Sequence, residues 1–104
     1  MIANSNLRDL KKNISLSFRS SPFGSGNHTH SNQNAFNLHY GGEAVFHAVG
    51  HYMNFCDPHN LLSYRNTRAH NTMLINGIGQ PFTPDAYGYI VRMFNGDNIS
   101  YALG

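Results

Sequence analysis

Histidine is the residue type in this sequence whose spacing could do chemistry. The chain contains seven histidines, and His28 and His30 lie two residues apart within the segment FGSGNHTHSNQNAF. In an extended segment, side chains two apart point to the same side, so both imidazoles would address one site. Such a pair is suited to metal binding or to proton transfer near neutral pH. Two solvated loop histidines are the alternative, and the spacing alone does not choose between them.

Other histidines follow downstream and extend the set of candidate ligands, namely His47, His51, His59 and His70. Zinc commonly takes three protein ligands and a water when it stays open for chemistry, so the fold would have to bring distant histidines together. Cys56 is the only cysteine, which excludes an internal disulfide and a C-x-x-C metal site. Protonation of the histidines below about pH 6.5 would make the surface cationic, which suits a polyanionic ligand.

Composition and charge exclude some classes of function for this chain. The formal net charge is +2 and no RRM-like or helix-turn-helix pattern is present, so nucleic acid is not an expected partner. The sequence has no run of 18 apolar residues and therefore no membrane span, and its start lacks the apolar stretch of a signal peptide. Charged residues make up 12% of the chain, and the richness in Asn, Ser, Gly, Phe and Tyr is typical of a loop-rich β-protein.

Alternation of apolar and polar residues predicts short strands between long irregular segments. Strands are expected at residues 14–18, 34–40, 44–49, 72–75, 88–94 and 99–103. Hairpin turns are expected at Gly41-Gly42, Asn76-Gly77 and residues 95–98, and long loops at residues 19–33 and 50–69. No helical period lasts three turns. The sequence therefore predicts an all-β fold, an antiparallel β-sandwich fragment forming one partial domain over residues 1–104.

The segment SPFGSGNHTHSNQNAF resembles S-P-[YF]-G-S-x-S-H-x-H-A-D-Q-N-x-F of the heparinase II/III-like polysaccharide lyases and related alginate lyases. Further short matches follow in the family's order, at Gly42-Glu43-Ala44, Gly50-His51-Tyr52, Asp57-Pro58-His59, Thr67-Arg68-Ala69-His70-Asn71 and Asn76-Gly77-Ile78-Gly79-Gln80. Members of the family carry the motifs G-E-P-L, S-G-Y-Y, S-P-H-H, T-[RK]-A-H-N and N-G-x-G-Q at the corresponding positions. The resemblance covers about residues 21–80.

The resemblance implies roles for three histidines. His28 matches the histidine that takes part in catalysis, His30 matches a zinc ligand, and His70 is the best match to a second zinc ligand. The family's remaining ligand is a carboxylate, whose position here is Ala48. The neighbouring His47 can replace it only through a bulge or register shift, because one step along a strand reverses the side-chain direction. A zinc cofactor is therefore expected on His30, His70 and His47, and the ligand in question is His47.

The resemblance also implies β-elimination on uronic-acid-containing polysaccharides, which needs a base, an acid and a group that neutralises the uronate carboxylate. Gln33, Asn34 and Arg68 are candidates for binding the sugar or its carboxylate, and Tyr52 for stacking on a sugar ring. For the two amides the alternative is loop structure. The alternative role of Arg68 is to pair with a carboxylate within the protein, and the alternative role of Tyr52 is aromatic packing.

In full-length members of this family, an N-terminal α/α toroid supplies the rest of the active site. Nothing in the chain resembles that toroid, so we expect a lyase fragment that acts on acidic polysaccharides only with the missing domain. A noncatalytic carbohydrate-binding or structural β-module derived from such a lyase is the alternative. Unpaired strand edges predict a homo-oligomer, and the resemblance implies a periplasmic or secreted location for the full-length enzyme.

Overall fold

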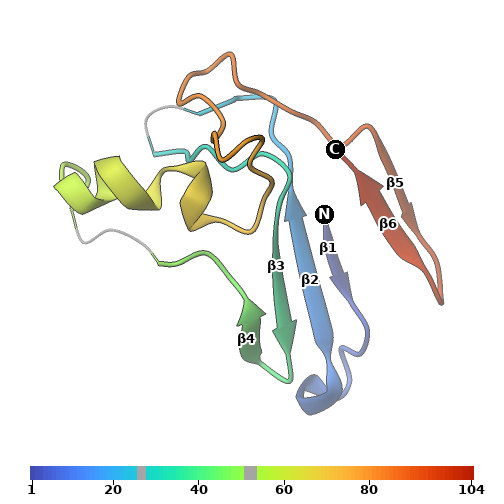
Figure 1. Cartoon of the computed structure of the whole chain (residues 1–104). Coiled ribbons are helices and arrows are strands. Elements are labelled where there is room, and N and C mark those ends of the chain that lie inside the picture. Colours follow the sequence, from blue (N-terminus) through green and yellow to red (C-terminus); the bar gives the residue numbers. More distant parts are fainter. Residues whose placement is uncertain (26–27, 51–53) are drawn as a thin grey trace.

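The computed structural model describes residues 1–25, 28–50 and 54–104. Within these residues six short strands form two antiparallel sheets, which confirms the predicted all-β class (Figure 1). The larger sheet has the order β1-β2-β3-β4, and β5 and β6 form a separate hairpin. The strands are β1 (Ile2–Asn4), β2 (Ile14–Arg19), β3 (Ala35–Tyr40), β4 (Glu43–Phe46), β5 (Arg92–Asn95) and β6 (Ser100–Leu103).

Strands β2 and β3 are the spine of the larger sheet. Their register sets Leu16 opposite Leu38 and Phe18 opposite Phe36, so the alternating apolar residues of both strands share one face. These two strands lie within a residue or two of the predicted ranges. The 19–33 loop between them carries the histidine segment, so the spine fixes both ends of that loop.

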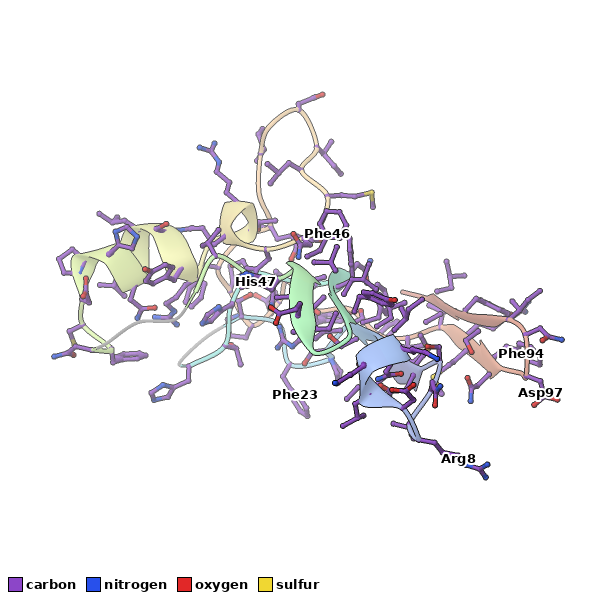
Figure 2. The ribbon with its side chains drawn as sticks, turned by 90° about the horizontal axis from the view of Figure 1, so that it is seen from below. Arg8, Phe23, Phe46, His47, Phe94 and Asp97 are labelled. Atoms are coloured by element: carbon purple, nitrogen blue, oxygen red, sulfur yellow. The ribbon has the colours of Figure 1, made fainter. Side chains whose placement is uncertain are left out.

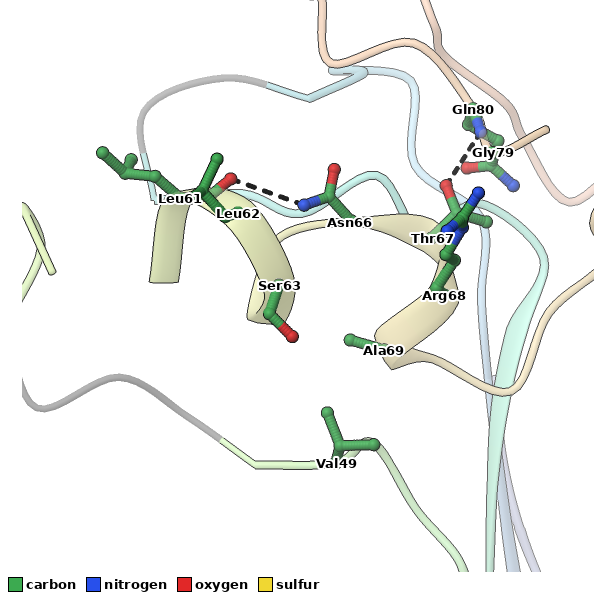
Figure 3. Close-up of a pocket in the computed structure, with 10 residues that line it drawn as sticks. All are labelled: Val49, Leu61, Leu62, Ser63, Asn66, Thr67, Arg68, Ala69, Gly79 and Gln80. Atoms are coloured by element: carbon green, nitrogen blue, oxygen red, sulfur yellow. Dashed lines mark hydrogen bonds between the residues drawn. The ribbon is translucent and has the colours of Figure 1, made fainter. Parts of the chain in front are cut away.

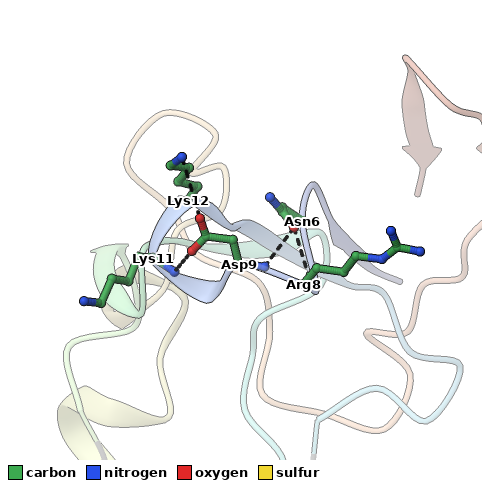
Figure 4. Close-up of polar contacts among 5 residues, drawn as sticks. All are labelled: Asn6, Arg8, Asp9, Lys11 and Lys12. Atoms are coloured by element: carbon green, nitrogen blue, oxygen red, sulfur yellow. Dashed lines mark hydrogen bonds and ion pairs between the residues drawn. The ribbon is translucent and has the colours of Figure 1, made fainter.

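Strand β1 was not predicted, because three residues are too few to display a period. The turn from β1 to β2 is closed by local side-chain bonds (Figure 4). Asn6 Oδ1 accepts the backbone N–H groups of Arg8 and Asp9 at 3.0 and 2.9 Å. Asp9 caps the short 3-10 helix η1 (Leu10–Lys12) by accepting the Lys11 N–H, and its carboxylate lies 3.7 Å from Lys12 Nζ.

Glycines close the β3–β4 hairpin at the predicted place, with φ of 58° at Gly41 and 90° at Gly42. Strand β4 ends at Phe46, earlier than predicted. Leu38 pairs with Phe46 but His39 pairs with Ala44, so Val45 is an extra residue that forms a β-bulge. The chain past β4 therefore leaves the sheet before reaching residue 49.

The final hairpin is also confirmed, although β5 and β6 are shorter than the predicted strands. The prediction of a strand at residues 72–75 is wrong, because only a single bridge joins Ile75 to Ile78. The residues that precede this bridge form hydrogen bonds outside a sheet. For example, Thr72 Oγ1 donates to the Gln33 carbonyl at 2.7 Å. The turn itself is confirmed, with φ of 53° at Asn76 and 74° at Gly77.

The predicted 50–69 loop contains two helical turns, η2 (Asn60–Tyr64) and η3 (Thr67–Ala69). Asp57 Oδ1 accepts the His59 N–H at 2.7 Å, and Pro58 and His59 form a short helical stretch that runs into η2. The Arg65 N–H donates to the Asn60 carbonyl five residues back, which makes η2 a π-helix. These helical turns were missed because they are too short to show a helical period.

Apolar burial is thin. Among the described residues only Ala35 and Ala69 are buried apolar side chains, whereas the buried polar residues are Ser25, Ser31, Gln33, Asn60, Arg65 and Thr67. The accessible surface is 7570 Å², against about 5,800 Å² expected for a compact chain of this mass. Phe23, Phe46 and Phe94 are among the exposed aromatics (Figure 2). Hydrogen bonds thus hold the loop region together, and much apolar surface stays uncovered.

None of the helices in the described ranges has the length and apolar character needed to cross a membrane.

Candidate functional site

Two histidines that lie 40 residues apart in the sequence are in contact in the structure. His30 Nδ1 lies 3.1 Å from His70 Nε2, and the ring centroids are 5.1 Å apart. His30 comes from the loop between β2 and β3, and His70 follows directly after η3. The structure thus brings together the two histidines to which the resemblance gave the zinc-binding role.

Both imidazoles are half-buried, and burial is the main cause that lowers their pKa values below the ordinary 6.5. The charges of Arg65 and Arg19 lower the pKa of His30 further, and His30 itself lowers the pKa of His70. A hydrogen bond to the Tyr64 backbone raises the pKa of His70 in the opposite direction. At neutral pH the pair is therefore uncharged, the state in which imidazole binds metal.

The contact between the two rings requires one nitrogen to donate and the other to accept. The tautomers of the two rings decide which of these nitrogens carries the shared proton.

A hydrogen-bonded junction holds the two histidine segments against each other. The buried Ser31 donates its N–H to the Arg65 carbonyl at 2.9 Å, and its own carbonyl accepts the Thr67 hydroxyl at 2.8 Å. The same hydroxyl accepts the Gln80 N–H at 2.8 Å. Thr67, which is 2% exposed, therefore links the His30 loop, the His70 segment and the chain after the Asn76-Gly77 turn.

Gln33 has a structural role within this junction. Its side chain is 6% exposed, and Oε1 accepts the Ser21 N–H at 2.7 Å while Nε2 faces the Gly24 and Ala86 carbonyls at 3.4 Å. Its backbone exchanges two bonds with the Gln80 side-chain amide, at 2.8 and 2.9 Å. These bonds correspond to the loop-structure alternative that the sequence analysis gave for this residue.

Asn34 adopts a left-handed backbone conformation with φ of 56° and lines two neighbouring cavities of about 540 and 500 Å³. Its Oδ1 is buried without a hydrogen-bond partner in the described structure. An orphaned acceptor at a cavity wall can receive a hydroxyl or amide donor from a ligand. The residue thus remains a candidate for substrate binding.

Arg68 lies at the rim of a cavity of about 710 Å³ between the helical turns and the chain after β4 (Figure 3). The lining residues include Val49, Asn66, Thr67, Arg68 and Gln80. Arg68 is exposed, and its Nη2 donates to the Gly77 carbonyl at 3.3 Å. The structure thus places a guanidinium beside a cavity wide enough for a small polar ligand.

His28 is exposed and lies at a turn, so the segment is irregular and not an extended strand. Its ring packs against Phe55, with the centroids 4.6 Å apart. His28 and His30 therefore contact different groups, one at the surface and one in the half-buried histidine pair. The two histidines of the H-T-H segment therefore do not face one common site, as an extended segment would have required.

The model of the family described as heparinase II/III-like, C-terminal, matches residues 3–98. The chain belongs to this family. A search of curated proteins finds no match. The match extends the resemblance from the 21–80 segment to nearly the whole chain, including the strands on either side of the histidine loops.

The carboxylate that the resemblance implies as a further zinc ligand has no counterpart among the described residues. His47 is exposed after β4, and its Nδ1 faces the carbonyl of its neighbour Ala48. The bulge needed to redirect the chain is present at Val45, yet within residues 1–25, 28–50 and 54–104 no three His, Cys, Asp or Glu side chains group as a metal site. The predicted stacking residue Tyr52, like His51, lies outside the described residues.

Sequence reasoning missed Thr67 and Arg65 as residues that build this site. Thr67 stands inside the recognised T-R-A-H-N segment, but nothing in a sequence says that its hydroxyl would be buried against Ser31. Arg65 stands outside the recognised segments, and its burial depends on the π turn of η2. Only the fold supplies these signals.

Proposed function

We propose that this chain carries the histidine-bearing part of a lyase site that cleaves uronic-acid-containing polysaccharides by β-elimination. Family membership together with the arrangement of the three motif histidines carries the proposal. His28 is exposed to a ligand, while His30 and His70 meet at 3.1 Å. Each motif histidine thus has surroundings that suit the role the family implies for it.

The proposed reaction removes the proton at C5 of the uronate and breaks the bond from C4 to the leaving oxygen. The electrons of the C5–H bond form the C4–C5 double bond, and the leaving oxygen takes up a proton. A neutral imidazole accepts a proton well near pH 7, and its protonated form can donate one. His28 is the candidate for one of these transfers, because it is the exposed histidine of the motif.

Negative charge grows on the uronate carboxylate as the C5 proton leaves, so a nearby cation lowers the barrier. We assign that task to Arg68, whose guanidinium lies beside the cavity of about 710 Å³. A planar guanidinium matches a carboxylate with two parallel hydrogen bonds. Asn34 Oδ1, the orphaned acceptor, is suited to a sugar hydroxyl.

We further propose that His30 and His70 hold zinc. Two nitrogens at the usual distance from a tetrahedral zinc lie about 3.3 Å apart, close to the 3.1 Å between His30 Nδ1 and His70 Nε2. When bound, zinc would fix the junction between the loop and η3; the chain's own residues carry the proton transfers.

The uncovered apolar surface supports the proposal that a partner completes this site. Large apolar side chains are exposed on both sheets, among them Ile2, Val45, Phe46, Met93 and Phe94. The accessible surface exceeds that of a compact chain by about 1,700 Å², as much as one side of a large obligate interface. The α/α toroid of full-length family members is the proposed partner, and a second copy is the competing one.

Calorimetric titration with a uronate tetrasaccharide, such as one derived from heparin, tests the proposal. The matched control ligand is the same tetrasaccharide with its carboxylates reduced to alcohols. We expect binding of the uronate form alone, weakened at least tenfold by Arg68→Met and unchanged by Arg8→Met, whose side chain projects away from the sheets (Figure 2). Equal binding of both tetrasaccharides would contradict the proposed recognition of uronate.

Absorbance of the unsaturated product measures turnover in the same samples. We expect no appreciable product from the chain alone, because the partner's groups are needed. Strong turnover by the chain alone would overturn the need for a partner and leave the lyase proposal standing.

A noncatalytic carbohydrate-binding module is the second candidate function. Tyr87 and Tyr89 favour it, because both are exposed and their ring centroids lie 5.8 Å apart, a pair on which sugar rings can stack. This reading predicts that Tyr87→Ala abolishes tetrasaccharide binding while Arg68→Met leaves it intact. The lyase reading predicts the reverse order of effects.

A further inference from the structure

Arg65 is a buried cation in contact with two aromatic rings. Its side chain is 6% exposed, and the guanidinium carbon lies 4.1 Å from the Phe82 ring centroid and 5.1 Å from that of Phe55. A guanidinium at these distances is attracted to the ring faces, more strongly where water is excluded. The two rings come from different loops, so Arg65 joins the segment before η2 to the segment after Pro81.

The π turn of η2 places Arg65 at this position. The Arg65 N–H donates to the Asn60 carbonyl, and Asn60 Nδ2 donates to the Phe55 carbonyl at 2.7 Å. Asn60 is fully buried, so these two bonds fix the start and the end of the turn relative to each other. Phe55 is therefore held by its backbone through Asn60 and by its ring through Arg65. An ordinary α-turn would rotate Arg65 by about 100°.

Phe55 also contacts His28, the histidine to which the proposed function gives proton transfer. The His28 and Phe55 rings are tilted by 48° with centroids 4.6 Å apart. The loop at His28 forms a turn and belongs to none of the strands or helices. Packing against Phe55 is thus a direct restraint on the imidazole, and Arg65 stabilises the ring that provides it.

We propose that Arg65 is a positioning residue that orients the His28 imidazole through Phe55. The inference rests on the proposed function, since orientation of His28 matters for chemistry only if His28 touches the substrate. Arg65 contacts Phe55 and Phe82, and Phe55 contacts His28. A cation able to stack on both rings is needed here, which explains why a buried arginine occupies the position.

Proton NMR of the whole chain tests this, by following the cross-peak between the ring protons of His28 and Phe55. Arg65→Met keeps the length of the side chain and removes its planar charge. We expect the cross-peak to be lost and the His28 ring signals to move toward those of an unpacked histidine. Backbone signals from β2 and β3 should stay in place, which separates repositioning from unfolding. Arg65→Lys, which restores a cation, should recover part of the cross-peak intensity.

Two further variants keep the test decisive. Phe55→Leu removes the ring and leaves the contact between Arg65 and Phe82, so it should move the His28 signals in the same direction as Arg65→Met. Arg8→Met replaces an exposed arginine in the turn between β1 and β2 and should change none of them. An unchanged His28–Phe55 cross-peak in folded Arg65→Met would overturn the inference.

Adding the uronate tetrasaccharide to the same samples separates this inference from the proposed function. A wild-type His28 signal that moves with the tetrasaccharide, together with an unaltered cross-peak in Arg65→Met, would refute the positioning role alone. A wild-type His28 signal that ignores the tetrasaccharide would refute the proposed role of His28. Loss of the cross-peak in that case would still support Arg65 as the residue that orients the ring.

Discussion

Removing the Thr67 hydroxyl should open the junction that holds the histidine pair. Thr67→Val keeps the shape of the side chain but deletes the donor to the Ser31 carbonyl and the acceptor of the Gln80 N–H, both at 2.8 Å. Leaving a buried partner without its hydrogen bond costs about 1–2 kcal/mol, so the two together cost about 2–4 kcal/mol. That loss lowers the folding equilibrium constant by about 30- to 1,000-fold.

The loss is large against the stability available. A chain of this size is typically stable by about 5–15 kcal/mol, and with Ala35 and Ala69 as its buried apolar residues among those described, the lower end is expected. Equilibrium unfolding in urea, followed by circular dichroism, measures the change in free energy. Thr67→Ser retains the hydroxyl and should cost about 1 kcal/mol for the lost methyl group.

Thr83→Val is the matched control for this experiment. Its hydroxyl accepts the Asp85 N–H at 2.9 Å in an exposed turn, so its loss should change the free energy of unfolding by less than about 0.5 kcal/mol. If Thr67→Val were no more destabilising than Thr83→Val, the reasoning that hydrogen bonds hold this junction would be refuted.

Three further predictions concern the histidines and the glycine turns. Burial lowers the pKa of His30 and His70, so below about pH 6.5 the unfolded chain takes up protons that the folded pair resists. The free energy of unfolding should therefore decrease as the pH is lowered. The urea midpoint of a variant carrying glutamine at both positions should decrease less. Calorimetric titration with zinc should lose more than about 100-fold in affinity with His30→Ala or His70→Ala, and little with His39→Ala; equal losses in all three would contradict the proposed ligands. Gly24→Ala should destabilise the chain more than Gly42→Ala in urea unfolding, because both have positive φ but only at Gly24 would the new Cβ overlap a backbone carbonyl; equal effects would count against the close approach.

The sequence predicted the strands whose residues alternate and the turns that glycine dictates. Residues 14–18 and 34–40 became β2 and β3 because a period of two over five or more residues has few other solutions. The Asn76-Gly77 turn followed from the positive φ that both residues tolerate. Residues 72–75 failed to form a strand because Thr72 bonds the Gln33 carbonyl, a long-range contact that local pattern does not encode.

The candidate site was predictable only in part. The T-R-A-H-N and H-T-H segments gave His30 and His70 as partners by resemblance, and the fold places their nitrogens 3.1 Å apart. Gln33 was weighed between ligand binding and loop structure, and its buried amide supports the loop. Arg65 was missed because its role depends on the π turn that begins at Asn60, and one extra residue in a helical turn leaves no mark in the sequence.

The meeting of His30 and His70 underlies both the proposed zinc site and the assignment of the motif segments to one site. Nitrogen NMR of uniformly labelled chain, free of metal and at neutral pH, tests it most directly by measuring the scalar coupling between ring nitrogens across an N–H···N hydrogen bond. We predict a coupling between His30 Nδ1 and His70 Nε2. The absence of this coupling in folded chain, with each ring showing the nitrogen shifts of an isolated imidazole, would contradict the account.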